Sequence, residues 1–304
     1  MTAFHHEAVF YETDDEYVAV MVPDILATVG RDGAVLAAVA GAKRQLLAEA
    51  LGTDAGRVRF TDMEALGRNP ACIIPAWREF LHDAGPEPVL GIGEPVWPGR
   101  SDAELVECSR HESLLNLAFD KGRAWHLLCP YDVRTLADGV LDEARRNHPY
   151  VRSHGSSDTS GVYGGQAALA WEDQLPAPPR QPVELGFTEG DLPLVRHFAS
   201  ERARSAGMRG ERIGDLVLAI HELVANSLRH GGGRGLLRMW EQDGTFLCEV
   251  VDAGHIVDPL AGRGRRDLAG TNGRGLWIVN HLCDLVQVRS TPRGTVVRVH
   301  MRLG

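Results

Sequence analysis

The feature that most constrains the fold is a break in the sequence pattern between residues 151 and 182. This stretch begins rich in Ser and Gly and ends in a cluster of prolines, a composition that disfavours both a long helix and a central strand. It predicts a linker. The 304-residue chain is therefore expected to form two domains, at residues 1–150 and 183–304.

The first domain is predicted from short apolar runs that alternate with longer helical patterns. Strands are expected at residues 6–11, 34–40, 58–63, 88–96 and 124–131, and helices at residues 14–30, 42–52, 73–85, 101–119 and 134–147. Such alternation favours a parallel sheet, because parallel strands need crossover connections. The pattern predicts a doubly wound α/β domain.

The second domain shows a different order of elements. One strand at residues 183–187 precedes two helices at 191–207 and 211–231. Strands follow at 235–242 and 245–254, then a loop rich in Gly and Arg at 255–275, a helix at 276–284, and strands at 285–290 and 294–301. Grouped helices beside mostly antiparallel strands predict an α+β two-layer sandwich.

The bulk composition excludes several classes of protein. The formal net charge of −9 argues against direct binding of nucleic acid. The N-terminus has no basic stretch followed by an apolar core, and no run of about 18 apolar residues occurs, so we expect a cytoplasmic protein without a membrane segment. The five cysteines include no C-x-x-C pair, which predicts buried thiols rather than disulfides or a structural zinc site.

A Walker-type phosphate loop is also excluded. That loop requires the pattern G-x-x-x-x-G-K-[ST], and neither of the two lysines, Lys43 and Lys121, lies in one. A nucleotide would have to be bound by other means.

The helix predicted at residues 211–231 carries two rows of side chains, one apolar and one polar. At 100° per residue one apolar face collects Ile213, Leu216, Val217, Ile220, Leu223 and Val224. Glu222, Asn226 and His230 form a second row along the edge of that face. Taken alone, Glu222 and Asn226 are better interpreted as a solvated surface pair that makes a weak i,i+4 contact.

Motifs further along the chain suggest a nucleotide site instead. Asp252 ends an apolar strand and can accept a hydrogen bond from an adenine amino group, while Gly254 permits close approach of the backbone. The run Gly270–Gly275 precedes a helix whose N-terminus favours phosphate. An asparagine carbonyl suits Mg²⁺, and Glu222, one turn from Asn226, can take a proton from a hydroxyl.

This order of motifs resembles the N, G1 and G2 boxes of the GHKL (Bergerat-fold) ATPases. The forms E-L-V-A-N-S-x-x-H-G and G-R-G-L-W-I-V look most like those of the anti-sigma-factor serine/threonine kinases. By this resemblance Glu222 is the catalytic base, Asn226 the Mg²⁺ ligand and Asp252 the adenine contact. The other nucleotide-binding positions that it implies are Gly254, Gly270, Thr271, Gly273, Arg274, Gly275, Leu276 and Thr295. One departure is Ile256, because a full D-x-G-x-G box has glycine there.

The same resemblance implies a function. A protein of this family binds ATP or ADP, sequesters an alternative sigma factor, and phosphorylates a serine or threonine of a STAS-domain anti-sigma-factor antagonist. Such kinases commonly form homodimers.

The first domain resembles the MEDS-type sensory domains through HEAVFY, RNPACIIPAW, GIGEPVW and RHESLLNLAF. The resemblance implies a RecA-like α/β layout and an unidentified ligand. Glu94, Trp97, His111 and Asn116 are candidates for a sensory pocket near the carboxyl ends of the strands. The alternative is that Trp97 covers the core and His111 is an ordinary helix residue.

Two other functions remain open on the sequence. His111-Glu112 precedes the N box in a helix, as the phosphoacceptor of a sensor histidine kinase does, although a strand and a Gly/Pro-rich stretch intervene here. The second domain could also be a non-catalytic scaffold that binds a sigma factor.

Overall fold

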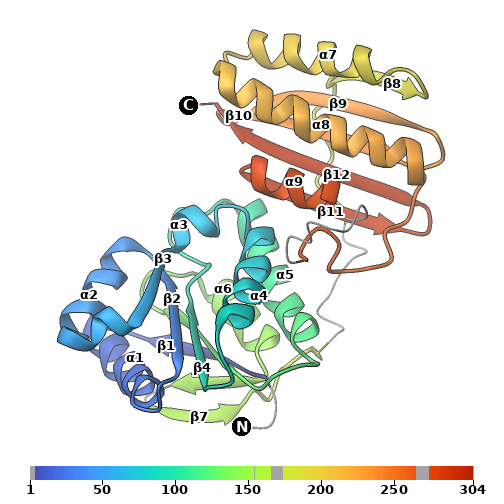
Figure 1. The fold of residues 1–304 in the computed structure, drawn as a ribbon. Coiled ribbons are helices and arrows are strands. Elements are labelled where there is room, and N and C mark those ends of the chain that lie inside the picture. Colours follow the sequence, from blue (N-terminus) through green and yellow to red (C-terminus); the bar gives the residue numbers. More distant parts are fainter. Residues whose placement is uncertain (1–3, 154, 166–173, 265–273, 304) are drawn as a thin grey trace. The chain divides into compact units, whose positions relative to one another are not determined.

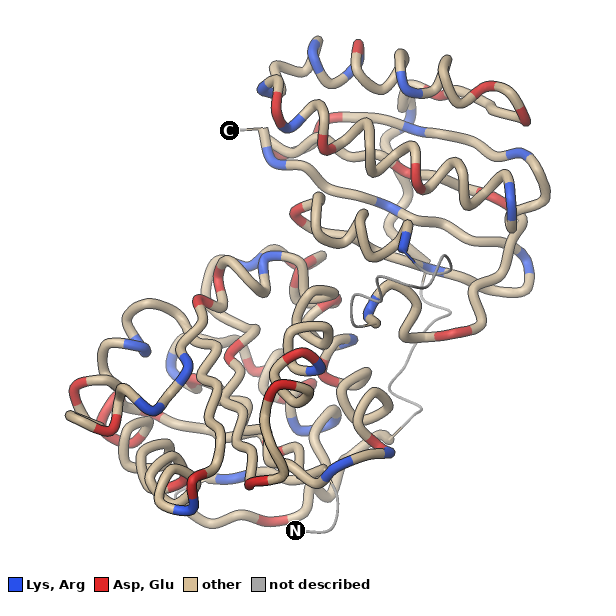
Figure 2. The backbone as a smooth tube through the Cα atoms, viewed as in Figure 1, with Lys and Arg blue, Asp and Glu red and all other residues tan. Residues whose placement is uncertain are grey.

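The structure, a computed structural model, describes residues 4–153, 155–165, 174–264 and 274–303. The chain forms two compact units, Met1–Leu169 and Ala170–Gly304 (Figure 1). Each unit has its own hydrophobic core, as independent domains do. Acidic and basic residues are interspersed along the backbone of each unit (Figure 2).

The N-terminal unit is built on a seven-stranded sheet with the strand order β3-β2-β4-β5-β1-β6-β7. All neighbouring strands pair in parallel except β6 and β7, which are antiparallel. The strands are β1 (His5–Tyr11), β2 (Ala34–Val39), β3 (Val58–Asp62), β4 (Val89–Gly93), β5 (His126–Asp132), β6 (Tyr150–Ser153) and β7 (Ser156–Thr159).

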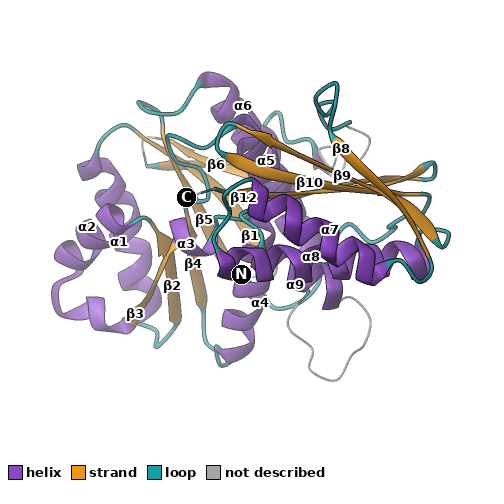
Figure 3. Cartoon of the chain, turned by 90° about the horizontal axis from the view of Figure 1, so that it is seen from above, coloured by secondary structure: helices purple, strands orange, loops and turns teal. Residues whose placement is uncertain are grey.

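Helices cover both faces of this sheet, as the doubly wound prediction requires (Figure 3). They are α1 (Asp14–Val29), α2 (Gly41–Leu51), α3 (Met63–Leu66), α4 (Ile73–Asp83), α5 (Asp102–Ala118) and α6 (Asp138–Asn147), with short 3-10 turns at Gly52–Arg57 and Pro70–Cys72. Side chains of α1 and α2 pack with Val9 and Tyr11 of β1. Because side chains alternate along a strand, His6 and Ala8 of β1 face the opposite side, toward α5.

Strands β6 and β7 correct the predicted domain boundary. They lie within residues 150–159, so the sheet extends into the stretch that was predicted to be a linker from residue 151 onward. Both strands are short, and β7, which forms the edge of the sheet beside β6, is exposed along its whole length. A polar edge strand gives almost no hydrophobic signal, which explains why the sequence pattern missed it.

The C-terminal unit is a two-layer sandwich, as predicted. Its five-stranded sheet has the order β11-β12-β10-β9-β8, and every neighbouring pair is antiparallel. Three helices pack on one face of the sheet (Figure 1). The elements are β8 (Val183–Thr188), α7 (Leu192–Ser205), α8 (Gly210–His230), β9 (Arg234–Gln242), β10 (Thr245–Asp252), α9 (Arg274–Leu282), β11 (Leu285–Thr291) and β12 (Gly294–Arg302).

Helix α8 buries the face that the sequence predicted. Ile213, Leu216, Ile220, Leu223 and Val224 belong to the core, and Val217 packs against it partly buried. Glu222 and Asn226 remain half-buried, one turn apart along the edge of that face. None of the helices in the described part of the chain combines the length and apolar composition needed to cross a membrane.

Candidate functional site

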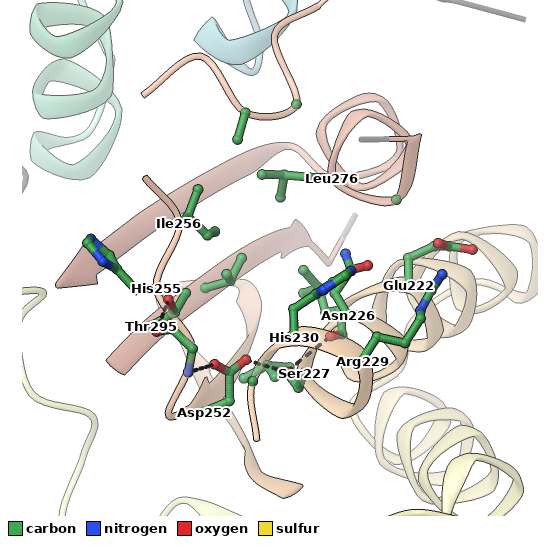
Figure 4. A pocket seen from close by; sticks show the side chains of 18 of the residues that line it. Glu222, Asn226, Ser227, Arg229, His230, Asp252, His255, Ile256, Leu276 and Thr295 are labelled. Atoms are coloured by element: carbon green, nitrogen blue, oxygen red, sulfur yellow. Dashed lines mark hydrogen bonds between the residues drawn. The ribbon is translucent and has the colours of Figure 1, made fainter. Parts of the chain in front are cut away.

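A cavity of about 720 Å³ lies between α8, the start of α9 and the adjoining ends of β10 and β12 (Figure 4). Its lining includes eight of the predicted site residues: Glu222, Asn226, Asp252, Gly254, Arg274, Gly275, Leu276 and Thr295. Cavities of roughly 300–1,000 Å³ are typical of small-molecule sites. The fold therefore brings together motifs that are spread over more than 70 positions of the sequence.

Glu222 and Asn226 stand beside the first turn of α9. A Cβ atom added to Gly275 would lie 2.9 Å from both Asn226 Nδ2 and Glu222 Oε2, so a larger residue at 275 would displace these side chains. The first N–H groups of a helix lack intrahelical partners and favour anionic groups. A carboxylate and an amide thus flank a backbone segment suited to bind phosphate.

The chain before α9 is only partly described. Of the predicted phosphate-binding positions, Gly270, Thr271 and Gly273 lie outside the described residues. The segment ending at residue 264 packs against α9, where Asn280 Nδ2 donates a hydrogen bond to Gly262 O at 3.1 Å.

Asp252 closes the opposite end of the cavity, at the last position of β10. Its Oδ2 accepts a hydrogen bond from Ser227 Oγ at 2.5 Å, and its Oδ1 accepts one from Gly254 N at 2.7 Å. A Cβ atom on Gly231 would lie 2.4 Å from Asp252 Cγ, so glycine after α8 makes room for the carboxylate. Each carboxylate oxygen has a second lone pair, which leaves Asp252 able to accept from a ligand amino group.

Thr295 is placed next to Asp252 by the register of β12 against β10. Its Oγ1 donates to Gly254 O at 2.8 Å, and Ser290 Oγ lies 2.7 Å from the same Oγ1. Ser290 Oγ in turn accepts from Ile256 N at 2.8 Å. Since Thr295 donates its proton to the carbonyl, Ser290 must donate to Thr295, and the three bonds hold residues 254–256 in place.

Ile256, which stands where the glycine box would have glycine, lines the cavity with its side chain (Figure 4). It is not among the non-glycine residues with positive φ. Its backbone therefore needs no glycine here, and the side chain adds an apolar surface that could contact a planar base.

Sequence reasoning missed Ser227, which holds Asp252, and Ser290, which holds Thr295. Ser227 belongs to the quoted motif, but its role depends on the distance from α8 to the end of β10. Ser290 lies on β11, and only the pairing of β11 with β12 places it beside Thr295.

Two of the four residues predicted for a sensory pocket in the N-terminal unit, Glu94 and Asn116, contact opposite ends of β1. Glu94 accepts a hydrogen bond from Tyr11 Oη at 3.0 Å, at the last residue of β1. Asn116 lies 3.0 Å from His6 Nδ1, near the first residue of the same strand. Five residues of strand separate these two places by about 17 Å.

The other two candidates are Trp97 and His111. The Arg100 guanidinium lies 3.5 Å from the centre of the Trp97 ring, which gives Trp97 a cation–π contact. His111 is 1% exposed within α5. The interpretation of Trp97 and His111 as structural residues fits these positions.

Glu94 nevertheless has an unusual environment. Burial raises the pKa of its carboxyl to about 7, although the Tyr11 hydroxyl and the Lys43 ammonium act in the opposite direction. The Lys43 Nζ lies over the rings of Tyr11 and Tyr17, at 4.6 and 4.7 Å from their centres. Such a shift marks a titratable group at the carboxyl end of β4.

Comparison with known families assigns both units. Residues 5–149 match the family model of MEDS, the methanogen/methylotroph, DcmR sensory domain. Residues 187–301 match the model of the histidine kinase-like ATPase domain. The chain thus combines a MEDS domain with a domain of the GHKL ATPase class, and the second assignment implies a nucleotide site.

Individual relatives cover parts of the chain. A protein named single-stranded DNA-binding protein, from Thermus aquaticus, is 33% identical over 111 residues, which are 34% of this chain and 39% of the relative. The chain therefore spans about two fifths of that relative's length. Among solved structures, the RsbU and RsbW domains of a Mycobacterium tuberculosis protein align at 20% identity with a TM-score of 0.32, covering 41% of this chain and 33% of the other. The histidine kinase AdeS of Acinetobacter baumannii aligns at 13% identity with a TM-score of 0.26, covering 41% and 69%.

Proposed function

We propose that this protein is an ATP-dependent anti-sigma factor with serine/threonine kinase activity. In this proposal the C-terminal domain binds ATP with Mg²⁺, sequesters an alternative sigma factor, and phosphorylates a STAS-domain antagonist of that sequestration. The observation that carries it is the convergence of Glu222, Asn226 and Gly275 at the start of α9, in one cavity with Asp252. The match to the histidine kinase-like ATPase domain supports the nucleotide-binding part.

Each residue has a distinct proposed role. Asp252 accepts a hydrogen bond from the adenine amino group, and Asn226 offers its carbonyl oxygen to Mg²⁺. The start of α9 binds the phosphates through backbone N–H groups. Glu222 accepts the proton of the attacking hydroxyl as the phosphoryl group passes to that oxygen and ADP leaves.

The N-terminal domain supplies the input in this proposal. A MEDS domain at residues 5–149 is described as sensory, and its state would alter the kinase or the access of partners. A homodimer through the C-terminal domain is also part of the proposal, as is a RecA-like layout of the first domain.

The histidine kinase alternative requires a phosphoacceptor that the γ-phosphate can reach. The one histidine that the sequence suggested, His111, is 1% exposed and lies inside the core of the N-terminal unit. Its neighbour Glu112 is also 1% exposed. Phosphorylation at His111 would require local unfolding of α5, so this observation favours the serine/threonine kinase.

The experiment measures ATP binding and phosphoryl transfer separately. The full-length protein is used to capture its sigma factor and STAS protein from native extract with and without Mg·ATP, and the STAS protein is then purified as substrate. We expect Glu222→Gln to bind ATP like the wild type and to lose phosphoryl transfer by about 10²–10⁴-fold, the usual contribution of a general base. Asn226→Ala should lose binding of Mg·ATP itself.

The matched control is Glu211→Gln, the same change about three turns earlier on the same helix, where the side chain is exposed. It should leave both measurements unchanged. An acid-stable, base-labile phosphoryl product supports serine or threonine, whereas a base-stable, acid-labile one supports histidine. Transfer that is unaffected by Glu222→Gln and Asn226→Ala overturns the mechanism, and sigma binding that survives both without any transfer supports the scaffold alternative.

A further inference from the structure

Four side chains of metal-ligand type meet in the core of the N-terminal unit. His6 lies on β1, Glu112 on α5 and Cys129 on β5, while His148 follows α6 directly. All four are at most 1% exposed. They come from positions up to 142 residues apart in the sequence, so the fold alone assembles them.

The potential ligand atoms all lie within 4.8 Å of one another. Glu112 Oε2 lies 3.1 Å from His6 Nε2 and 3.3 Å from His148 Nε2. Cys129 Sγ lies 3.4 Å from His6 Nε2 and 3.6 Å from Glu112 Oε2. With bond lengths of about 2.0–2.3 Å, the ligand atoms of a tetrahedral zinc ion lie about 3.3–3.8 Å apart, which is close to the distances here.

Hydrogen bonds fix which nitrogen of His6 carries the proton. The amide nitrogen of Asn116 donates to two backbone carbonyls, Glu112 O at 3.3 Å and Asn147 O at 2.8 Å. The amide oxygen of Asn116 must therefore be the atom that faces His6 Nδ1 at 3.0 Å, and it can only accept. In its neutral form His6 thus has a proton on Nδ1 and a lone pair on Nε2.

His148 is held in the same way. Its Nδ1 lies 2.8 Å from the carbonyl oxygen of Ala144, which can only accept a hydrogen bond. Its Nε2 has no hydrogen-bond partner among the described residues, and neither does Glu112 Oε1. Metal-binding histidines commonly donate their second N–H to a carbonyl in this manner.

The result is a buried excess of lone pairs. Acceptors hold Nδ1 of both His6 and His148, so the neutral form of each ring turns the lone pair of Nε2 toward Glu112 Oε2. An imidazole lone pair and a carboxylate oxygen 3.1 Å apart repel each other unless a cation lies between them.

We propose that His6, Glu112, Cys129 and His148 bind a zinc ion in the core of the N-terminal domain. Two imidazole nitrogens, one thiolate and one carboxylate oxygen form a four-ligand set of the kind that tetrahedral Zn²⁺ takes in proteins. With four protein ligands and no exposed face, the site is closed and holds β1, α5, β5 and the α6–β6 turn together. The proposal stands independently of the proposed kinase function.

Binding at this site requires loss of the thiol proton. Burial raises the pKa of Cys129 well above its ordinary value, with Glu112 acting in the same direction. The zinc ion must therefore displace that proton, and affinity should fall as the pH is lowered.

A second group of similar residues on the other face of β1 serves as a comparison. Glu7 there lies 3.2 Å from His126 Nε2, but Arg152 Nη2 approaches the same carboxylate oxygen at 2.7 Å. The guanidinium already supplies the cation, so a metal ion is neither needed nor favoured. His126 is accordingly the matched control for His148.

The test uses the full-length protein, stripped with a chelator and titrated with Zn²⁺ or Co²⁺. We expect about one tightly bound equivalent, and the Co²⁺ form should show tetrahedral d–d bands with a near-ultraviolet thiolate-to-cobalt band. Cys129→Ser should abolish the thiolate band and weaken Zn²⁺ binding by about 10–100-fold or more, and His148→Ala should weaken it similarly. His126→Ala should retain both the band and the affinity.

Three results would overturn the site. These are the absence of saturable Zn²⁺ binding to the wild type, a thiolate band that persists in Cys129→Ser, and equal loss of binding in His126→Ala. If the ligand variants fail to fold, X-ray absorption at the zinc edge of the wild-type protein decides, because a shell without one sulfur contradicts the proposal.

Discussion

Two helices, one in each unit, carry the same local pattern of His-Glu followed by Asn four positions after the glutamate. It occurs at residues 111–116 in α5 and at residues 221–226 in α8. In both helices the Glu and Asn side chains lie one turn apart on one face. In α5 the glutamate is 1% exposed, whereas in α8 both side chains are half-buried at the edge of a cavity.

The difference shows that the surroundings, not the local pattern, decide what the pair can do. Residues of β1 and β5 cover the face of α5, so Glu112 meets imidazoles and a thiol, and Asn116 orients one imidazole. The face of α8 meets Gly275, which adds no side chain. One pair is therefore closed to substrates, and the other remains accessible.

The largest expected contrast is in folding stability. Glu112→Ala removes the buried carboxylate that balances the charge of the proposed zinc ion, and it should lower the free energy of unfolding of the zinc-bound first domain by about 3–5 kcal/mol. Glu222→Ala, at a half-buried position in an open cavity, should change that of the second domain by at most about 0.5 kcal/mol. Urea unfolding followed by hydrogen exchange of peptides from each domain measures both, and equal effects would contradict the comparison.

A second contrast concerns pH. The folded-state pKa of Glu94 is raised from 4.5 to about 7, so its stabilising contribution is complete below pH 4.5 and is lost as the pH rises to about 7. The whole loss is on the order of 3 kcal/mol. Glutamine cannot ionise. The free energy of unfolding of Glu94→Gln should therefore rise relative to that of the wild type as the pH increases from 4.5 to about 7. A difference that is constant from pH 4.5 to 7 would contradict the raised pKa.

The smallest expected effect comes from a variant that tests how Asp252 is held in the cavity of the second domain. Ser227→Ala removes the hydroxyl that donates to Asp252 Oδ2, and a less well-held carboxylate should bind adenine less tightly. We expect a loss of ATP affinity of up to about tenfold, or about 1.4 kcal/mol, measured by calorimetric titration. Ser205→Ala, which removes an exposed hydroxyl on α7, is the control and should leave affinity unchanged.

Much of the fold was predictable because strong periodic patterns dominate it. The alternation in the first unit and the apolar face of α8 both appear in the structure, since burial of that face is what folds the helix onto the sheet. Strands β6 and β7 were not predicted, because each has only four residues and forms by pairing, β6 with β1 and β7 with β6, rather than from its own composition.

The nucleotide site and the proposed zinc site also differ in how far the sequence predicts them. Glu222, Asn226 and Asp252 could be proposed from motifs, because each motif has a local chemistry and the motifs occur in a known order. The cluster of His6, Glu112, Cys129 and His148 has no such spacing, and the absence of a C-x-x-C pair suggested that no zinc site would form.

By itself, the sequence determined the two-domain organisation, the parallel and antiparallel sheets, and the residues of a nucleotide-type motif. Tertiary structure alone decided which His-Glu-Asn pattern is sealed in the core and which lines a cavity. The physical reason is that periodicity records only which face of a helix is turned inward. Whether that face meets the side chains of a strand or the bare backbone of a glycine depends on elements far away in the chain.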